Sequence, residues 1–105
     1  MLRHDKLADY VLENIESNGN VLKAFVFGSY ARGEEKWGSD VDFLLVVNDS
    51  TQDAEIRNIV LNLSPDDYTL PELDITVYRE SNVAKDSFFL SQVKKDWRLV
   101  YEKLS

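Results

Sequence analysis

The sequence contains no cysteine, two prolines and a single histidine. Without cysteine, the chain cannot form disulfide bonds or thiolate metal sites. No apolar run approaches the roughly 20 residues that span a bilayer, and the residues after Met1 do not form the apolar core of a signal peptide. These absences predict a cytoplasmic protein with no membrane association. At 105 residues the chain has the length of one small domain, so we expect a single domain over residues 1–105.

Basic residues are also scarce. Lysine and arginine number 12 against 19 acidic residues, which gives a net charge of −7, and Lys94-Lys95 is the only adjacent basic pair. A protein that follows nucleic acid normally carries a basic stripe that neutralises phosphates. The composition therefore argues against long DNA or RNA as a substrate. A free nucleotide is compatible, because a bound cation can supply local positive charge.

The spacing of apolar residues predicts helices and strands in alternation. Helices are expected at about 5–17, 30–32, 51–63 and 82–95, and strands at about 21–27, 41–47 and 73–78. The segment 97–101 has no periodicity that decides between strand and helix. This order predicts a two-layer α/β (α+β) fold, with a small mixed β-sheet, helices mainly on one face and an open, functional opposite face.

The expected helices carry two local predictions about side chains. Ser50 or Thr51 is expected to cap the helix that ends near Leu63. His4 lies beside the chain terminus, where a histidine is usually solvated, so we expect no catalytic role for it.

One stretch organises the chain: an apolar run ends at Gly28-Ser29, and a second begins with Asp40-Val41-Asp42. Alternate residues of a strand point to the same face, so Asp40 and Asp42 project together while Val41 faces away. Two adjacent carboxylates repel each other unless a cation lies between them, and oxygen ligands favour Mg²⁺ or Mn²⁺. Gly28 allows a phosphate to approach closely, and free N–H groups at a helix start attract anions. The stretch therefore predicts a site for a metal-bound triphosphate.

This combination resembles the nucleotidyltransferase superfamily typified by DNA polymerase beta. Its members carry Gly-Ser or Gly-Gly after an apolar residue, a gap of about ten residues, and then Asp-apolar-Asp. Here ten residues separate Ser29 from Asp40. The motif Gly-Ser-Tyr-Ala-Arg-Gly, followed by Ser-Asp-Val-Asp, looks most like that of the minimal nucleotidyltransferase (MNT) group. The resemblance implies the polymerase beta-like fold, two Mg²⁺ ions with Mn²⁺ as an alternative, and ATP as the substrate.

For the MNT group the resemblance also implies a partner. These proteins commonly pair with a helical HEPN protein, often a ribonuclease toxin, and act as antitoxin by adenylylating a tyrosine of that toxin. The resemblance thus implies transfer of AMP to a protein hydroxyl. The chain shows no acceptor-binding module, so the acceptor site would come from the partner or from a second copy of the chain. A homo-oligomer therefore stays an open alternative.

A third carboxylate, Asp74, completes the implied catalytic set and is also expected to be a metal ligand with Asp40 and Asp42. Asp74 stands in an apolar strand, where an unpartnered carboxylate is costly. It matches the third acidic position of the superfamily, whose role is to help deprotonate the attacking hydroxyl, and Asp40 and Asp42 would then bridge both metals. The alternatives are structural: Asp74 paired with a lysine or arginine, Asp40 and Asp42 in a capped turn, and Gly28 and Ser29 in an ordinary strand-to-helix turn.

Three residues beside the motif are also candidates. Arg32 could bind a phosphate or a carboxylate such as that of Asp42. Lys36 could reach a triphosphate or be merely solvated. Trp37 could stack on a base, anchor a partner or pack under the loop.

Two further functions stay open besides protein adenylylation. The domain could mask a helical partner without catalysis, and inhibition would then survive removal of all three aspartates. It could also transfer a nucleotidyl group to a small molecule such as an aminoglycoside, although the missing acceptor domain counts against that hypothesis.

Overall fold

Strands and helices alternate along most of the chain in the computed structural model, which describes residues 3–85 and 87–104. In chain order the elements are α1 (Arg3–Glu16), β1 (Val21–Phe27), α2 (Gly28–Ala31), β2 (Val41–Val47), α3 (Asp53–Leu63), β3 (Leu73–Arg79), α4 (Glu80–Val83), α5 (Phe88–Val93) and β4 (Arg98–Glu102). The strands form one sheet in the order β3-β2-β1-β4. β2 and β3 run parallel, while β1 is antiparallel to β2 and β4. The predicted α+β fold with a small mixed sheet is confirmed.

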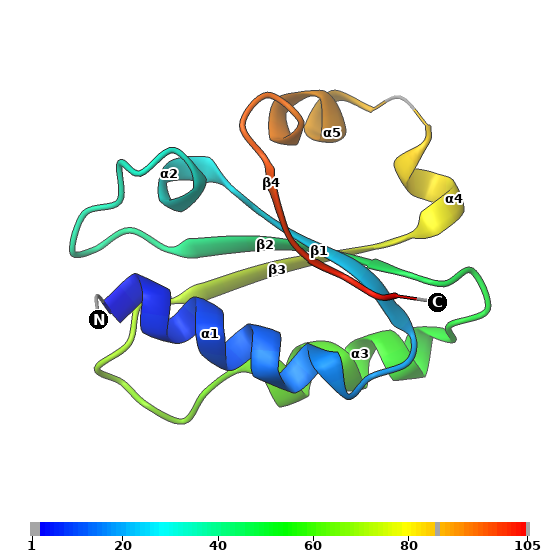
Figure 1. The fold of residues 1–105 in the computed structure, drawn as a ribbon, viewed down its shortest axis with the longest axis horizontal. Coiled ribbons are helices and arrows are strands. Elements are labelled where there is room, and N and C mark those ends of the chain that lie inside the picture. Colours follow the sequence, from blue (N-terminus) through cyan, green and yellow to red (C-terminus); the bar gives the residue numbers. More distant parts are fainter. Residues whose placement is uncertain (1–2, 86, 105) are drawn as a thin grey trace.

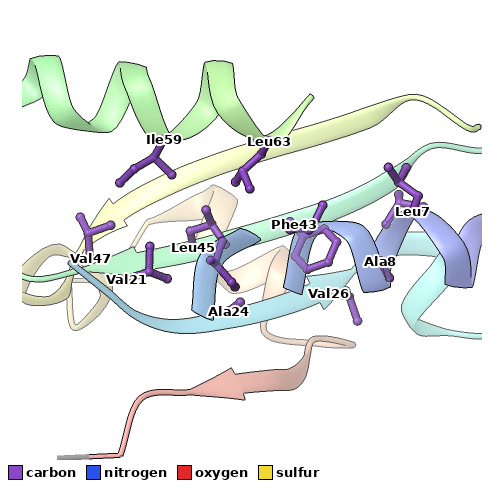
Figure 2. Packing of buried hydrophobic residues seen from close by; sticks show 13 residues of the cluster. Leu7, Ala8, Val21, Ala24, Val26, Phe43, Leu45, Val47, Ile59 and Leu63 are labelled. Atoms are coloured by element: carbon purple, nitrogen blue, oxygen red, sulfur yellow. The ribbon is translucent and has the colours of Figure 1, made fainter. Parts of the chain in front are cut away.

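The main core fills the space between the sheet and helices α1 and α3, which cover one face together (Figure 1). Phe43 and Leu45 of β2 are fully buried there and face Leu7 of α1 and Leu63 of α3 (Figure 2). These side chains repeat every second residue in the strand and every third or fourth residue in the helices, which gives each element one apolar face. The sequence pattern therefore determines which face of the sheet receives the long helices.

The opposite face of the sheet is partly covered by the short helices α4 and α5 (Figure 1). Leu44 of β2 is fully buried against Leu90 and Val93 of α5. Phe25 of β1 stacks on Trp97, with ring centroids 3.9 Å apart. This second, smaller core leaves less of the face open than the sequence predicts.

The predicted helix over 82–95 is two helices in the structure. α4 ends at Val83, and α5 begins after Ser87, whose hydroxyl oxygen accepts a hydrogen bond of 3.0 Å from the N–H of Leu90. A serine at this position satisfies a free N–H at a helix start and so favours a new helix over a continuous one. None of the helices within the described ranges is long and apolar enough to cross a membrane.

The predicted cap of α3 is wrong. Gln52 occupies the N-cap position and makes no capping hydrogen bond with its side chain. Thr51 is buried, and its hydroxyl donates instead to Oδ1 of Asn48 at 2.6 Å. The hydroxyl is therefore used by the turn that follows β2. The undecided segment near the C-terminus forms β4, which pairs with β1.

Candidate active site

The strand register places two of the predicted carboxylates side by side. Asp42 of β2 pairs with Asp74 of β3 in the parallel ladder and with Phe27 of β1 in the antiparallel ladder. Residues paired across strands project to the same face. Asp42 alternates with the core residue Phe43, so this face is the one opposite α1 and α3. Asp40 directly precedes β2, close enough for its charge to act on Asp42.

The crowding of these groups changes the ionisation of Asp42. The pKa of Asp42 is raised to about 6, mainly by burial and further by the negative charges of Asp74 and Asp40, while the positive charge of Arg32 opposes the rise. A carboxyl in this environment gains from a nearby cation, which compensates both the lost hydration and the like charges.

The turn at the end of β1 approaches Asp42 closely. Gly28 has a φ of +73°, in the left-handed region, and a Cβ at this position would overlap Oδ2 of Asp42. Only glycine accommodates both conditions without strain. Ser29 follows directly as the second residue of α2. The turn predicted to bind phosphates therefore lies against a carboxylate predicted to bind metal.

The donor set fits a metal that is shared with a substrate. In residues 3–85 and 87–104, no group of three or more histidine, aspartate or glutamate side chains is arranged to hold a metal ion. Mg²⁺ in phosphate-transfer sites commonly takes only one or two carboxylates, and substrate phosphates and water supply the other ligands. Asp42 with Asp40 or Asp74 provides such a pair of oxygen donors. The residues therefore fit a cation held jointly with a nucleotide, and not a cage made by the protein alone.

Arg32 lies beside the site and is paired with acidic side chains. Its Nη1 is 2.6 Å from Oδ2 of Asp96, and its Nε is 3.3 Å from Oε1 of Glu34. The other oxygen of Asp96 accepts a hydrogen bond of 3.4 Å from the N–H of Gly28. One carboxylate thus contacts two of the donors predicted for phosphate. No sequence motif marks Asp96, so its place beside the site is not predictable from the sequence.

A cleft beside these contacts lies between α2 and α5. It has a volume of about 350 Å³, and Gly28, Arg32, Phe89 and Asp96 are among the residues that line it. Phe89 is partly exposed, and its ring meets that of Phe27 edge to face at 6.0 Å. The cleft therefore combines an aromatic wall with a cationic side chain.

The loop between Ser29 and Asp40 carries two further candidate binding residues, Lys36 and Trp37, and both side chains are exposed. Trp37 is 77% exposed, and the guanidinium carbon of Arg3 lies 3.6 Å from its ring centroid. Of the predicted alternatives for Trp37, packing under the loop is wrong. The backbone N–H of Lys36 donates to Ser39 Oγ at 2.9 Å, and its side chain is exposed.

The prediction of a solvated His4 is also wrong. The residue is only 5% exposed, its Nε2 lies 2.9 Å from the carbonyl oxygen of Ser39, and its ring stacks on Tyr30. The expectation failed because α1 already begins at Arg3. His4 therefore lies in the first turn of a helix that packs on the sheet.

Comparison with known proteins identifies the family. The model for "Polymerase beta, Nucleotidyltransferase" matches residues 10–104. A Sulfolobus solfataricus protein assigned to the nucleotidyltransferases is 26% identical with a TM-score of 0.64, over 93% of this chain and 79% of that chain. No curated protein matches the chain.

Two more distant structures share the fold. Spectinomycin adenyltransferase from Enterococcus, solved with ATP and spectinomycin, has a TM-score of 0.70 at 15% identity, over 96% of this chain and 57% of that chain. A chain from the structure of tri-AMPylated Shewanella oneidensis HEPN toxin with MNT antitoxin has a TM-score of 0.52 at 14% identity, over 96% of this chain and 71% of that chain. These two likenesses show the fold, and the family match confirms the resemblance to the polymerase beta-like nucleotidyltransferases, so the chain belongs to that family.

Proposed function

We propose that this chain transfers AMP from ATP, with Mg²⁺, to a hydroxyl of a helical HEPN-type protein, a tyrosine by resemblance, and so acts as an antitoxin. The observation that carries the proposal is the pairing of Asp42 with Asp74, against a Gly28 turn that leaves no space for a side chain. Family membership supports nucleotidyl transfer. The likeness to a chain from the structure of an AMPylated HEPN toxin with MNT antitoxin supports the class of acceptor.

Each side chain has one task in this proposal. Asp40 and Asp42 would hold the cations jointly with the triphosphate. Asp74 would accept the proton of the attacking hydroxyl, while the bond from the α-phosphorus to the bridging oxygen breaks and pyrophosphate leaves. The N–H groups of the turn at Gly28 and Ser29 donate to phosphate oxygens. Bound Mg²⁺ supplies the positive charge that stabilises the transferring phosphoryl group.

Arg32 binds phosphate in this proposal once it has left Asp96. Its guanidinium is suited to two parallel hydrogen bonds with phosphate oxygens. It already lies beside the Gly28 turn, because both contact the same carboxylate. A phosphate that replaced the Asp96 carboxylate could accept hydrogen bonds from both groups.

The test uses the chain with Mg²⁺, ATP and the purified product of the neighbouring gene. Mass spectrometry of that protein should show a gain of one or more AMP units, which Asp42→Asn should abolish. Asp66→Asn is the matched control, since Asp66 is an exposed carboxylate in the loop before β3. No gain with the wild-type chain, or an equal gain with Asp42→Asn, would refute the proposal. Inhibition of the partner that survives loss of all three aspartates would indicate masking without catalysis.

Transfer to a small molecule is the second candidate. The likeness to spectinomycin adenyltransferase favours it. That enzyme is longer, since this chain spans 57% of it, so the acceptor site would need residues from elsewhere. The same assay with spectinomycin in place of the protein distinguishes the two acceptors by the product that carries AMP.

A further inference from the structure

The loop that joins the two halves of the motif is attached to the first turn of α1. Arg3 donates from Nη1 to the carbonyl oxygen of Trp37 at 3.0 Å, and Nε2 of His4 lies 2.9 Å from the carbonyl oxygen of Ser39. Among the hydrogen bonds of the described residues, these two are the only ones that join residues 35–40 to the remainder of the chain. The position of the segment that ends at Asp40 therefore depends on this turn.

The bond between His4 and Ser39 has a defined direction. A carbonyl oxygen only accepts hydrogen bonds, so Nε2 of His4 carries a proton and donates it. The ring is buried and stacks on Tyr30, with centroids 6.2 Å apart and planes 18° from parallel. His4 thus contacts the residue before Asp40 and a residue of α2 at the same time.

The next residue of the same turn holds α2 directly. The hydroxyl of Tyr30 donates to Oδ1 of Asp5 at 2.5 Å. Burial and this hydrogen bond raise the pKa of Tyr30 well above its ordinary value, so the hydroxyl keeps the proton that it donates. Tyr30 lies two residues after Gly28, which connects the Gly-Ser turn to α1.

A third attachment reaches the loop that leads to β3. Nε of Arg3 donates to the carbonyl oxygen of Thr69 at 2.8 Å. This loop also meets the start of β2, because the N–H of Val41 donates to the carbonyl oxygen of Glu72 at 2.9 Å. One turn of α1 therefore contacts the segments that precede β2 and β3, as well as α2.

We propose that Arg3, His4 and Asp5 are positioning residues for the nucleotidyl-transfer site. They connect Asp40 and the Gly28 turn to one helix, which the core holds in place, and so fix the distance between the predicted metal ligand and the predicted phosphate donors. The inference rests on the proposed function. Its consequence is large, because a displacement of about 1 Å in a reacting geometry can cost about 100-fold in rate.

The test measures binding of Mn²⁺ with a non-hydrolysable ATP analogue by calorimetry, together with hydrogen exchange of residues 35–40. His4→Leu removes the donor, whereas His4→Gln keeps an amide Nε2 that can donate. Ile15→Val is the matched control, because Ile15 is fully buried at the other end of α1. Tyr30→Phe deletes one hydroxyl and tests the second attachment if His4→Leu does not fold.

His4→Leu should raise the Kd of the Mn²⁺–analogue complex about tenfold, as loss of a group that orients a metal ligand does, and should speed exchange at residues 35–40. His4→Gln should recover most of the loss, and Tyr30→Phe should weaken binding in the same direction. Ile15→Val should lower the Tm and leave the Kd and the exchange at residues 35–40 unchanged.

Two outcomes would refute the positioning role, and they can be told apart. If the wild-type chain binds and the His4 and Tyr30 variants bind equally well, or if Ile15→Val loses as much affinity, the positioning role is refuted and the proposed function stands. If the wild-type chain binds neither Mn²⁺ nor the analogue, the proposed function fails, and the inference fails with it.

Discussion

Replacing Asp42 by asparagine should stabilise the metal-free protein near neutral pH. The folded protein holds the proton of Asp42 more tightly than the unfolded chain, because burial and the charges of Asp74 and Asp40 raise its pKa from 3.8 to about 6. A group of this kind favours folding when it is protonated. The free energy of unfolding therefore falls as pH rises from about 4 to about 6, and it stays lower above that range. Asparagine at position 42 does not ionise, so Asp42→Asn should not lose this part of the free energy of unfolding as pH rises.

The magnitude follows from the size of the shift. One pKa unit corresponds to about 1.4 kcal/mol, so the full shift of Asp42 would cost about 3 kcal/mol in a dry site. The carboxyl is only half-buried, and solvent screening reduces the cost to about 1 kcal/mol. For a domain of this size, a change of about 1 kcal/mol moves the Tm by about 4 °C.

Thermal unfolding of the two proteins at pH 3.5 and pH 7.5, in the presence of a chelator, tests this reasoning. Asp42→Asn should have the higher Tm at pH 7.5 and a nearly equal Tm at pH 3.5. Asp67→Asn is the control of opposite sign: hydrogen bonds from Thr69 lower the pKa of Asp67, so its removal should lower the Tm at pH 7.5. If Asp42→Asn lowers the Tm at pH 7.5, or if its gain persists at pH 3.5, ionisation of Asp42 is not what destabilises the wild-type protein. Addition of Mg²⁺ and nucleotide should stabilise the wild-type protein selectively.

Three further predictions concern the turn, its acidic neighbour and α5. Gly28→Ala should lower the free energy of unfolding in urea by about 2 kcal/mol or more, because backbone strain and overlap with the Asp42 carboxylate add. Gly33→Ala should lower it by only about 1 kcal/mol, since Gly33 has a φ of +72° but an added Cβ would meet nothing within 4 Å. Equal losses would show that the overlap at Gly28 costs nothing. Asp96→Asn weakens the competition for Arg32 and should lower the calorimetric Kd of Mg²⁺–ATP about threefold; an unchanged or higher Kd would show that Asp96 does not compete. Ser87→Ala should lower stability by about 1 kcal/mol in thermal unfolding, through loss of the α5 cap, and an unchanged Tm would count against that cap.

The sequence predicts the parts of the fold that depend on local pattern. The two central strands have the bounds that their apolar runs indicate, over 21–27 and 41–47. The alternation around Asp42 correctly predicts that its carboxylate faces away from Phe43 and the main core. A strand buried on at least one face carries this information in every second residue, because a shift by one position would bury its polar side chains.

The contacts that the sequence analysis missed join residues far apart in the chain. His4 and Ser39 are 35 positions apart, and Arg32 and Asp96 are 64 positions apart. Such contacts depend on how α1 and α5 pack on the sheet, and local periodicity does not contain that information. The break before α5 is not predictable for another reason. The helical spacing of apolar residues continues across it, and the new helix start depends on one side chain, the hydroxyl of Ser87.

The parallel pairing of β2 and β3 limits where insertions and deletions can occur in related chains. The ladder alone sets Asp42 opposite Asp74, so α3 and its flanking loops can lengthen or shorten without separating the two carboxylates. A single residue inserted within either strand would instead rotate one carboxylate toward the core under α1 and α3. We therefore expect length variation in this family between residues 48 and 72. Within β2 or β3 we expect it only where a second change restores the pairing of Asp42 with Asp74.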